Sequence, residues 1–195
     1  MGKIYYLMGK SSSGKDSIYK ELQKRQPDFR TVTLYTTRPI RDGETDGVEY
    51  HFIDAHGLSA YEKAGKIIEC RTYQTIHGPW AYATIDDGQI DLTRGNYLII
   101  GTLESYEKMK AYYGPGALIP LYIEVEDGER LYRALRRERE QAEPKYAEMC
   151  RRFLADSEDF SEKRLKEAGI KKRYINDDME RCLNEIIKEI RYGKF

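Results

Sequence analysis

The sequence predicts an α/β fold in three layers, with helices covering both faces of a parallel sheet. Two observations predict it. The apolar runs at residues 4–8 and 97–101 have the continuous hydrophobicity of strands that are buried on both faces. Each run is followed by a stretch whose apolar residues have helical spacing. A chain of 195 residues can bury one full core, so we expect a single domain.

The loop after the first strand has the spacing of a phosphate-binding P-loop. Residues 9–17 read G-K-S-S-S-G-K-D-S, which fits G-x-x-x-x-G-K. Glycines let successive amide groups face one anion, and the following helix adds its positive end. An ordinary flexible turn is the alternative, but the strand before and the helix after favour phosphate binding. The expected ATP-phosphate ligands are Gly9, Ser11, Ser12, Ser13, Gly14, Lys15, Asp16 and Ser17.

The segment after the P-loop predicts a small, strand-rich insertion over residues 36–84. Its strands are rich in β-branched or alternating apolar residues, and a turn-rich stretch at 37–47 separates the first two. The expected elements in this first part of the chain are a helix over about 15–25, strands over 31–36, 48–53, 66–73 and 80–84, and a short helix over about 58–64.

Alternation of strands and helices resumes after residue 84. Pro120 weakens the predicted strand 118–123 or places it at an edge of the sheet. The core is expected to comprise 1–35, 85–132 and 153–195, with a basic helical segment at 133–152. The expected elements are strands over 97–101, 118–123 and 174–175, and helices over about 103–112, over 129–152 with a break at Pro144, and over 179–191.

Two arginines in the turn-rich stretch suggest a second phosphate site. Arg38 and Arg41 are three apart, beside Thr36 and Thr37, and an arginine pair of this kind can fork onto one phosphate. Tyr50 can donate a further hydroxyl. Two solvated loop arginines are the alternative. An enzyme that transfers a phosphoryl group needs an acceptor site beside its donor site, which favours the phosphate site.

The chain resembles the guanylate kinase family along nearly its whole length. After the P-loop come T-T-R-P-I-R-D-G-E at 36–44 and D-G-V-E-Y-H-F at 46–52, then I-E at 68–69, Y-A-T at 82–84, a basic segment and I-N-D-D at 175–178. The resemblance implies a P-loop kinase with a nucleotide-monophosphate-binding insertion at 36–84 and a helical lid at 133–152. It also implies that ATP, with Mg²⁺ as cofactor, phosphorylates GMP to give GDP and ADP.

The resemblance implies a role for each matching residue. Arg38, Arg41, Tyr50 and Tyr82 would hold the acceptor phosphate. Asn176 would lie beside the donor adenine. Two others, Glu69 and Thr84, would contact the acceptor base. The role of Glu69 has a physical reason, because guanine offers two adjacent donors to a carboxylate, whereas adenine would leave that carboxylate unpaired.

Arginines of the lid are expected to be catalytic, since phosphoryl transfer depends mainly on positioning and on cations at the transferring group. The family's lid has two arginines four apart and a third before an apolar residue. Arg152 fits the third place; Arg133 and Arg137 have the spacing of four but lie farther from Arg152 than in the pattern. Solvated helix charges are the alternative for several of them. The candidates are Arg133, Arg136, Arg137, Arg139, Arg151 and Arg152, and the predicted catalytic residues are Lys15, Arg38, Arg137 and Arg152.

Three departures from the family put strict selectivity for GMP in question. Leu34 stands where the family has a serine that reads guanine, the strand 97–101 has no carboxylate, and Ala83 replaces a glycine. The phosphate-binding residues are kept. A related P-loop kinase with another phosphorylated acceptor, and a non-catalytic guanylate-kinase-like binding module, therefore remain alternatives.

The residues after Lys15 suggest a metal site. Asp16 stands where a Ser or Thr hydroxyl is usual, and the hydroxyl follows at Ser17. With no carboxylate at the end of strand 97–101, Asp16 beside Ser17 is a candidate for the magnesium shell. In the alternative, Asp16 only complements the helix dipole.

Composition limits the partners and the location. Acids and bases balance, at 33 each, which argues against a nonspecific nucleic-acid binder. No apolar run approaches the roughly 20 residues of a membrane span, and the first strand begins almost at Met1, so we expect no signal peptide and no membrane partner. Three dispersed cysteines suit a reducing cytoplasm. We expect a cytoplasmic monomer or small homo-oligomer.

Overall fold

A computed structural model describes residues 1–75 and 78–193 of the chain. Within these residues the core is a parallel sheet, formed by β1 (Ile4–Met8), β2 (Arg30–Thr31), β7 (Tyr97–Gly101), β8 (Leu118–Glu124) and β9 (Tyr174–Ile175). The strand order is β2-β7-β1-β8-β9, and all the pairings are parallel. The carboxyl ends of these strands therefore share one edge, where the loop after β1 lies.

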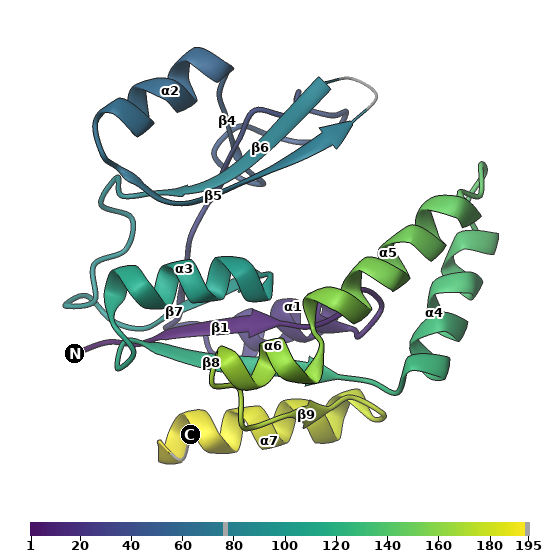
Figure 1. Cartoon of the computed structure of the whole chain (residues 1–195). Coiled ribbons are helices and arrows are strands. Elements are labelled where there is room, and N and C mark those ends of the chain that lie inside the picture. The colour runs from purple at the N-terminus through teal and green to yellow at the C-terminus, as the bar shows by residue number, and fades with distance from the viewer. Residues whose placement is uncertain (76–77, 194–195) are drawn as a thin grey trace.

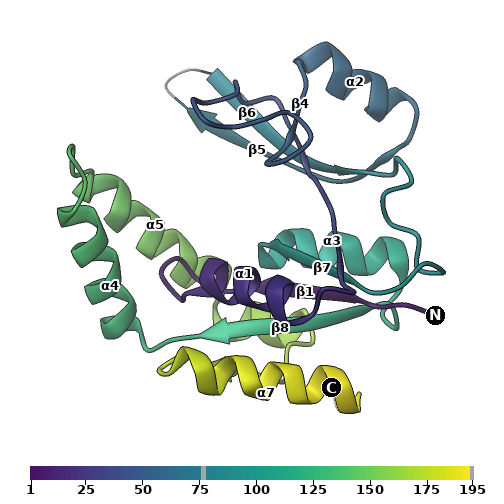
Figure 2. The ribbon, with the colours of Figure 1, turned by 180° about the vertical axis from the view of Figure 1, so that it is seen from behind.

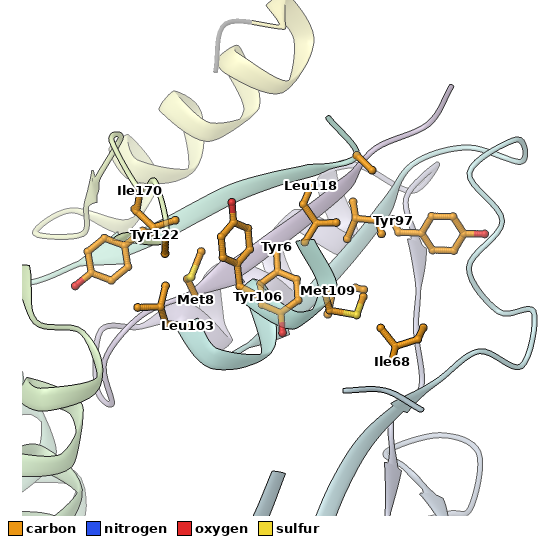
Figure 3. Close-up of a cluster of buried hydrophobic side chains, with 14 of the residues drawn as sticks. Tyr6, Met8, Ile68, Tyr97, Leu103, Tyr106, Met109, Leu118, Tyr122 and Ile170 are labelled. Atoms are coloured by element: carbon orange, nitrogen blue, oxygen red, sulfur yellow. The ribbon is translucent and has the colours of Figure 1, made fainter. Parts of the chain in front are cut away.

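Helices cover both faces of this sheet, as the sequence predicts. On one face, α1 (Lys15–Arg25) and α7 (Met179–Tyr192) pack on apolar residues such as Tyr5 and Leu7. On the other face, α3 (Leu103–Tyr113) and α6 (Glu162–Glu167) pack on Tyr6 and Met8. Figure 3 shows this second cluster, in which Tyr6 and Tyr106 lie side by side between sheet and helix. Alternate residues of β1 thus face opposite layers, and the three-layer α/β fold is confirmed.

The insertion forms a second, smaller sheet above α3 (Figures 1 and 2). Its strands and its helix are β3 (Tyr35–Thr36), β4 (His51–Phe52), α2 (Ala55–Lys63), β5 (Ile67–Thr75) and β6 (Gly78–Ile85). The strand order is β4-β3-β6-β5 among the described residues. Ile68 of β5 belongs to the core cluster of the main sheet, so the insertion is anchored to the core through β5 and α3.

The basic segment folds into a helical hairpin, called here the lid hairpin, of α4 (Asp127–Arg139) and α5 (Tyr146–Asp159). It projects from the carboxyl edge of the main sheet beside the P-loop (Figures 1 and 2). Pro144 lies between the two helices, where the sequence predicts a break. The hairpin extends beyond the predicted lid at both ends.

Three expected elements differ from the structure. The predicted strand 31–36 is two strands, because the chain leaves the main sheet after Thr31 and enters the insertion sheet at Tyr35. The predicted strand 48–53 is reduced to His51–Phe52, since residues 47–49 form a turn. Pro120 lies in a well-formed strand between β1 and β9, but β9 pairs with Ile123 and Glu124 only, so one side of β8 is open at the proline.

Candidate active site

The P-loop curls between β1 and α1 in a conformation that requires its glycines. Gly14 has a φ of 82°, and a Cβ there would lie 2.4 Å from Asn176 Nδ2. A Cβ on Gly9 would lie 2.5 Å from the carbonyl oxygen of Ile123. Ser12 also has a positive φ, of 63°. The loop backbone is therefore packed tightly against the ends of β8 and β9, in the shape that a curled anion-binding loop needs.

Asn176 supports this loop from beneath. Its side chain is buried, and Nδ2 donates to the carbonyl oxygen of Ser13 at 2.7 Å. Its main-chain amide donates to the main-chain carbonyl oxygen of Glu124 at the end of β8. The structure therefore brings Asn176 to the P-loop, and its contact with a donor adenine stays a prediction.

Two lid arginines reach the P-loop from above. Arg137 Nη2 donates to Ser12 Oγ at 3.2 Å, and Arg152 Nη2 donates to Ser11 Oγ at 3.2 Å. Both guanidinium groups thus lie over the loop that carries Lys15. Arg133 points elsewhere, to the carbonyl oxygen of Asn176 at 3.1 Å. Of the predicted lid arginines, Arg137 and Arg152 are the two that the described contacts bring to the loop hydroxyls.

A buried arginine that sequence reasoning missed joins the lid hairpin to the P-loop. Arg130 is 1% exposed, and it donates to Ser11 O at 3.0 Å and to the carboxylates of Asp127 and Asp156. Its guanidinium stacks 4.3 Å from the ring of Phe153. Asp156 Oδ2 also accepts from the Ser11 amide at 2.8 Å. The helical spacing of 130, 133 and 137 places all three on one face of α4, but this spacing does not distinguish a buried arginine from a solvated one.

On the acceptor side, Arg38 is held in place before any substrate arrives. It is 4% exposed, and its Nη1 and Nη2 fork onto the Glu44 carboxylate at 2.9 and 2.8 Å. Its guanidinium also lies 5.4 Å from the ring centres of Tyr50 and Phe52. The hydrogen bonds from Arg38 lower the pKa of the Glu44 carboxyl and raise that of Arg38. Glu44 is a further residue that the sequence prediction missed.

Tyrosines and an exposed arginine complete this side. The ring of Tyr50 contacts that of Tyr82 edge to face at 5.6 Å, and Tyr82 contacts Tyr73 at 5.9 Å. Arg41 is exposed, and its main-chain amide is fixed by Glu44 at 2.9 Å. The predicted acceptor-phosphate residues are therefore brought together in one corner of the insertion.

Glu69 and Thr84 face each other across β5 and β6. Thr84 Oγ1 donates to Glu69 Oε1 at 2.9 Å, as expected for two residues that would read one base. Arg71 also donates to this carboxylate, from Nε to Oε2 at 3.0 Å and from Nη2 to Oε1 at 3.3 Å. The side chain of Glu69 is 1% exposed and that of Arg71 10%. Sequence reasoning gave Arg71 no role.

The end of β7 has no room for a side chain at Gly101. A Cβ on Gly101 would lie 2.1 Å from the Tyr6 hydroxyl and 2.8 Å from Ser105 Oγ. These two hydroxyl groups are hydrogen-bonded to each other. Burial raises the pKa of Tyr6, so this hydroxyl stays protonated at neutral pH. A tyrosine and a serine thus fill the space over Gly101.

A cavity of about 540 Å³ is lined by the P-loop, the lid hairpin and the insertion. Lys15 and Ser11 line it from the P-loop, and Arg152 lines it from the lid hairpin. From the insertion it is lined by Arg41, Tyr73, Trp80 and Tyr82. A donor nucleotide on the P-loop and a phosphorylated acceptor at the insertion would meet here.

Oxygen donors for a magnesium ion stand at the start of α1. Mg²⁺ that arrives with a nucleotide keeps phosphate and water ligands, so it needs only one or two protein oxygens. The Ser17 hydroxyl and the Asp16 carboxylate, both exposed, are chemically suitable. Asp16 Oδ2 accepts from Lys15 Nζ at 3.3 Å. In residues 1–75 and 78–193, no three histidines, cysteines or acids group together as a metal site.

Comparison with known proteins gives one family. The family model described as guanylate kinase matches residues 1–86. A guanylate kinase of Frankia casuarinae is 46% identical over 63 residues, which are 32% of this chain and 34% of that protein. One of Chromobacterium violaceum is 31% identical over 93 residues, covering 46% and 44%. The aligned part thus spans less than half the length of these relatives.

A solved structure extends the likeness in fold to the rest of the chain. The crystal structure of guanylate kinase from Anaplasma phagocytophilum matches with a TM-score of 0.65 at 17% identity, over 100% of this chain and 87% of that one.

Helices long and apolar enough to cross a membrane are absent from the part of the chain that the structure describes.

Proposed function

We propose that this chain is a nucleoside monophosphate kinase of the guanylate kinase family. It transfers the γ-phosphoryl group of ATP to a nucleoside monophosphate, with GMP as the acceptor that the family implies, and forms ADP and GDP. We place it in the cytoplasm as a monomer or small homo-oligomer.

The proposal rests on the positions of the cationic groups around the cavity. Arg137 and Arg152 donate hydrogen bonds to the hydroxyls of Ser12 and Ser11, so both lie over the loop that carries Lys15. Arg41 lines the same cavity from the insertion. A transferring phosphoryl group carries spread negative charge, and fixed cations on two sides stabilise it.

Each group has a distinct task in this reaction. The P-loop amides and Lys15 hold the β- and γ-phosphates of the donor. Arg38, Arg41, Tyr50 and Tyr82 hold the acceptor phosphate, and the Glu44 fork keeps Arg38 oriented. The reaction needs no covalent enzyme intermediate, because the acceptor phosphate oxygen attacks the γ-phosphorus directly and ADP leaves. Mg²⁺, bound with ATP near Ser17 and Asp16, would neutralise phosphate charge.

Retention of Lys15 and of the lid arginines argues against a non-catalytic binding module. The buried Arg71–Glu69 pair keeps the other alternative open, namely a kinase for a different phosphorylated acceptor.

The test is ADP formation in a coupled assay with ATP, Mg²⁺ and a panel of purine and pyrimidine monophosphates, together with phosphorylated sugars that carry no base. Turnover with at least one monophosphate is expected, together with its loss by at least about a hundredfold in Lys15→Ala. Turnover confined to a phosphorylated acceptor without a base would favour the alternative kinase. Absence of both turnover and ATP binding would refute the kinase assignment.

A further inference from the structure

The carboxylate of Glu69, which would read the base of the acceptor nucleotide, already accepts hydrogen bonds from neighbouring protein groups. Arg71 donates to both of its oxygens, and Thr84 donates a third hydrogen bond, to Oε1. A carboxylate has about four acceptor positions. Only one position remains, on Oε2, so the two-donor edge of guanine cannot fork onto both oxygens while Arg71 stays in place.

Arg71 is also fixed from its other side. Its Nη1 donates to Thr102 Oγ1 at 3.3 Å, and Thr102 is the residue that caps α3. The guanidinium therefore spans from the insertion to the core. Burial alone would lower the pKa of Arg71, but Glu69 raises it above its ordinary value, so Arg71 stays charged. Moving Arg71 aside would leave a buried charge without its partner, which is strongly unfavourable.

The neighbouring positions do not restore recognition of the base. Leu34 has no polar group, and Gly101 has no side chain. The insertion lines the cavity with Arg41, Tyr73, Trp80 and Tyr82, and neither Glu69 nor Arg71 is among the residues that line it. The residues that the insertion presents to the cavity thus offer a cation and aromatic surface. The carboxylates that line the cavity, Glu148, Asp156 and Asp159, come from the lid hairpin, and each is paired with an arginine.

We propose that Arg71 is a specificity-determining residue, which withdraws Glu69 from base recognition so that the acceptor site discriminates only weakly between guanine and adenine monophosphates. This inference rests on the proposed kinase function. It explains how Glu69 can be present in a site where Leu34 and Gly101 offer no polar side chain and where the Thr84 hydroxyl is itself bonded to Glu69. In this site Glu69 orders β5 through Arg71 and Thr84 and does not select the acceptor.

The test compares GMP, AMP and IMP in the intact protein and in Arg71→Met, which keeps a long side chain but removes the charge. The ratio of kcat/KM for GMP to that for AMP should stay below about 10 in the wild type. In Arg71→Met it should rise by at least about tenfold, because Glu69 is released to accept from guanine. IMP, which has N1–H but lacks the 2-amino group, should gain less than GMP. In the double variant Glu69→Gln/Arg71→Met the gain should vanish.

A binding measurement keeps the test independent of turnover and of folding defects. Trp80 is the single tryptophan of the sequence and lines the cavity, so its fluorescence can report equilibrium binding of GMP and AMP. Arg94→Met, at a 63% exposed side chain remote from the site, is the matched control and should leave the ratio unchanged. Circular dichroism shows whether each variant is folded.

The outcomes separate the two proposals. A wild-type preference for GMP above about a hundredfold, or a ratio in Arg71→Met that is unchanged or lower, overturns the role of Arg71. Binding ratios that behave as expected, without turnover of any monophosphate, overturn the kinase assignment alone. Absence of GMP and AMP binding in the folded wild type overturns the role of Arg71 as well.

Discussion

Arg130 of the lid hairpin donates a hydrogen bond of 3.0 Å from Nη1 to the main-chain carbonyl oxygen of Ser11 in the P-loop. The same guanidinium reaches Asp156 on the second lid helix, and Asp156 in turn accepts from the Ser11 amide. Both lid helices are therefore tied to one residue of the P-loop. Arg137 and Arg152, which donate to the hydroxyls of Ser12 and Ser11, lie on these same two helices.

Removal of Arg130 should destabilise the protein and loosen the lid. In Arg130→Met, both Asp156 and Asp127 lose their buried charge partner. We expect this loss to cost about 3 kcal/mol, which is at the low end for buried pairs because Asp127 is half exposed. Urea unfolding should show the loss, and hydrogen exchange at the P-loop should speed up. Arg139→Met, on an exposed position of the same helix, is the control and should change the free energy of unfolding by less than about 0.5 kcal/mol. Equal effects of the two variants would contradict this role.

The sequence predicted the parts of the site that depend on local spacing. The P-loop, the pair Arg38 and Arg41, and the lid arginines each lie in a short segment with a recognisable pattern. It did not predict Arg130, because a buried arginine in a highly charged helix has the same local pattern as a solvated one. Contacts between distant residues decide its burial, here with Ser11 and Asp156.

The same reason explains the errors in the fold. Residues 31–36 are mostly β-branched, so they fit one strand, and only the packing of the two sheets divides them between β2 and β3. Similarly, the sequence shows a glycine at the end of strand 97–101, but not why. Tyr6, ninety-five residues earlier, places its hydroxyl in the space above Gly101 and leaves no room for a side chain there.

Arg137 and Arg152 should each be required for rapid turnover. Replacement by alanine removes a cation placed over the P-loop, and we expect kcat to fall by about 10² to 10³ in each variant. The coupled ADP assay measures this loss. The matched control is Arg136→Ala, next to Arg137 on α4 and exposed. A similar loss in the control would show that the charge of the lid, and not the position of the two arginines, is what matters.

Gly101→Ala should be destabilising because its Cβ would overlap the Tyr6 hydroxyl at 2.1 Å. Overpacking of this kind costs about 1 to 3 kcal/mol. Tyr6→Phe removes the hydroxyl, so the double variant should recover part of the loss. Thermal unfolding of the four proteins gives the coupling energy, expected at about 0.5 to 3 kcal/mol. Strict additivity would show that the two residues do not compete for this space.

Asp16→Asn tests the two readings of the residue after Lys15. The carboxylate is 77% exposed in the first turn of α1, where a negative charge complements the helix dipole by about 0.3 to 1 kcal/mol. We expect a loss of stability of that size, with the Mg²⁺ concentration for half-maximal turnover unchanged. Titration with Mg²⁺ at saturating ATP measures this concentration. An increase of several-fold would instead assign Asp16 to the magnesium shell.

Stability should fall in alkaline solution through the buried tyrosines, and Tyr106 gives the clearest case. Burial raises the pKa of Tyr106 to about 12 from its ordinary value of 10.0. Below pH 10 the hydroxyl is protonated in both folded and unfolded chains, so its contribution is fully present. Between pH 10 and 12 the unfolded chain ionises first, which lowers the free energy of unfolding by about 2 to 3 kcal/mol over this range.

Tyr106→Phe keeps the ring contact with Tyr6 but cannot ionise. The melting temperature of the wild type should therefore fall more steeply than that of Tyr106→Phe between pH 10 and 12. The same two proteins at pH 8 and 9 are the control, because their difference should be constant there. Parallel curves up to pH 12 would mean that the Tyr106 hydroxyl ionises in the folded protein as readily as in the unfolded chain, contrary to its burial between α3 and the main sheet.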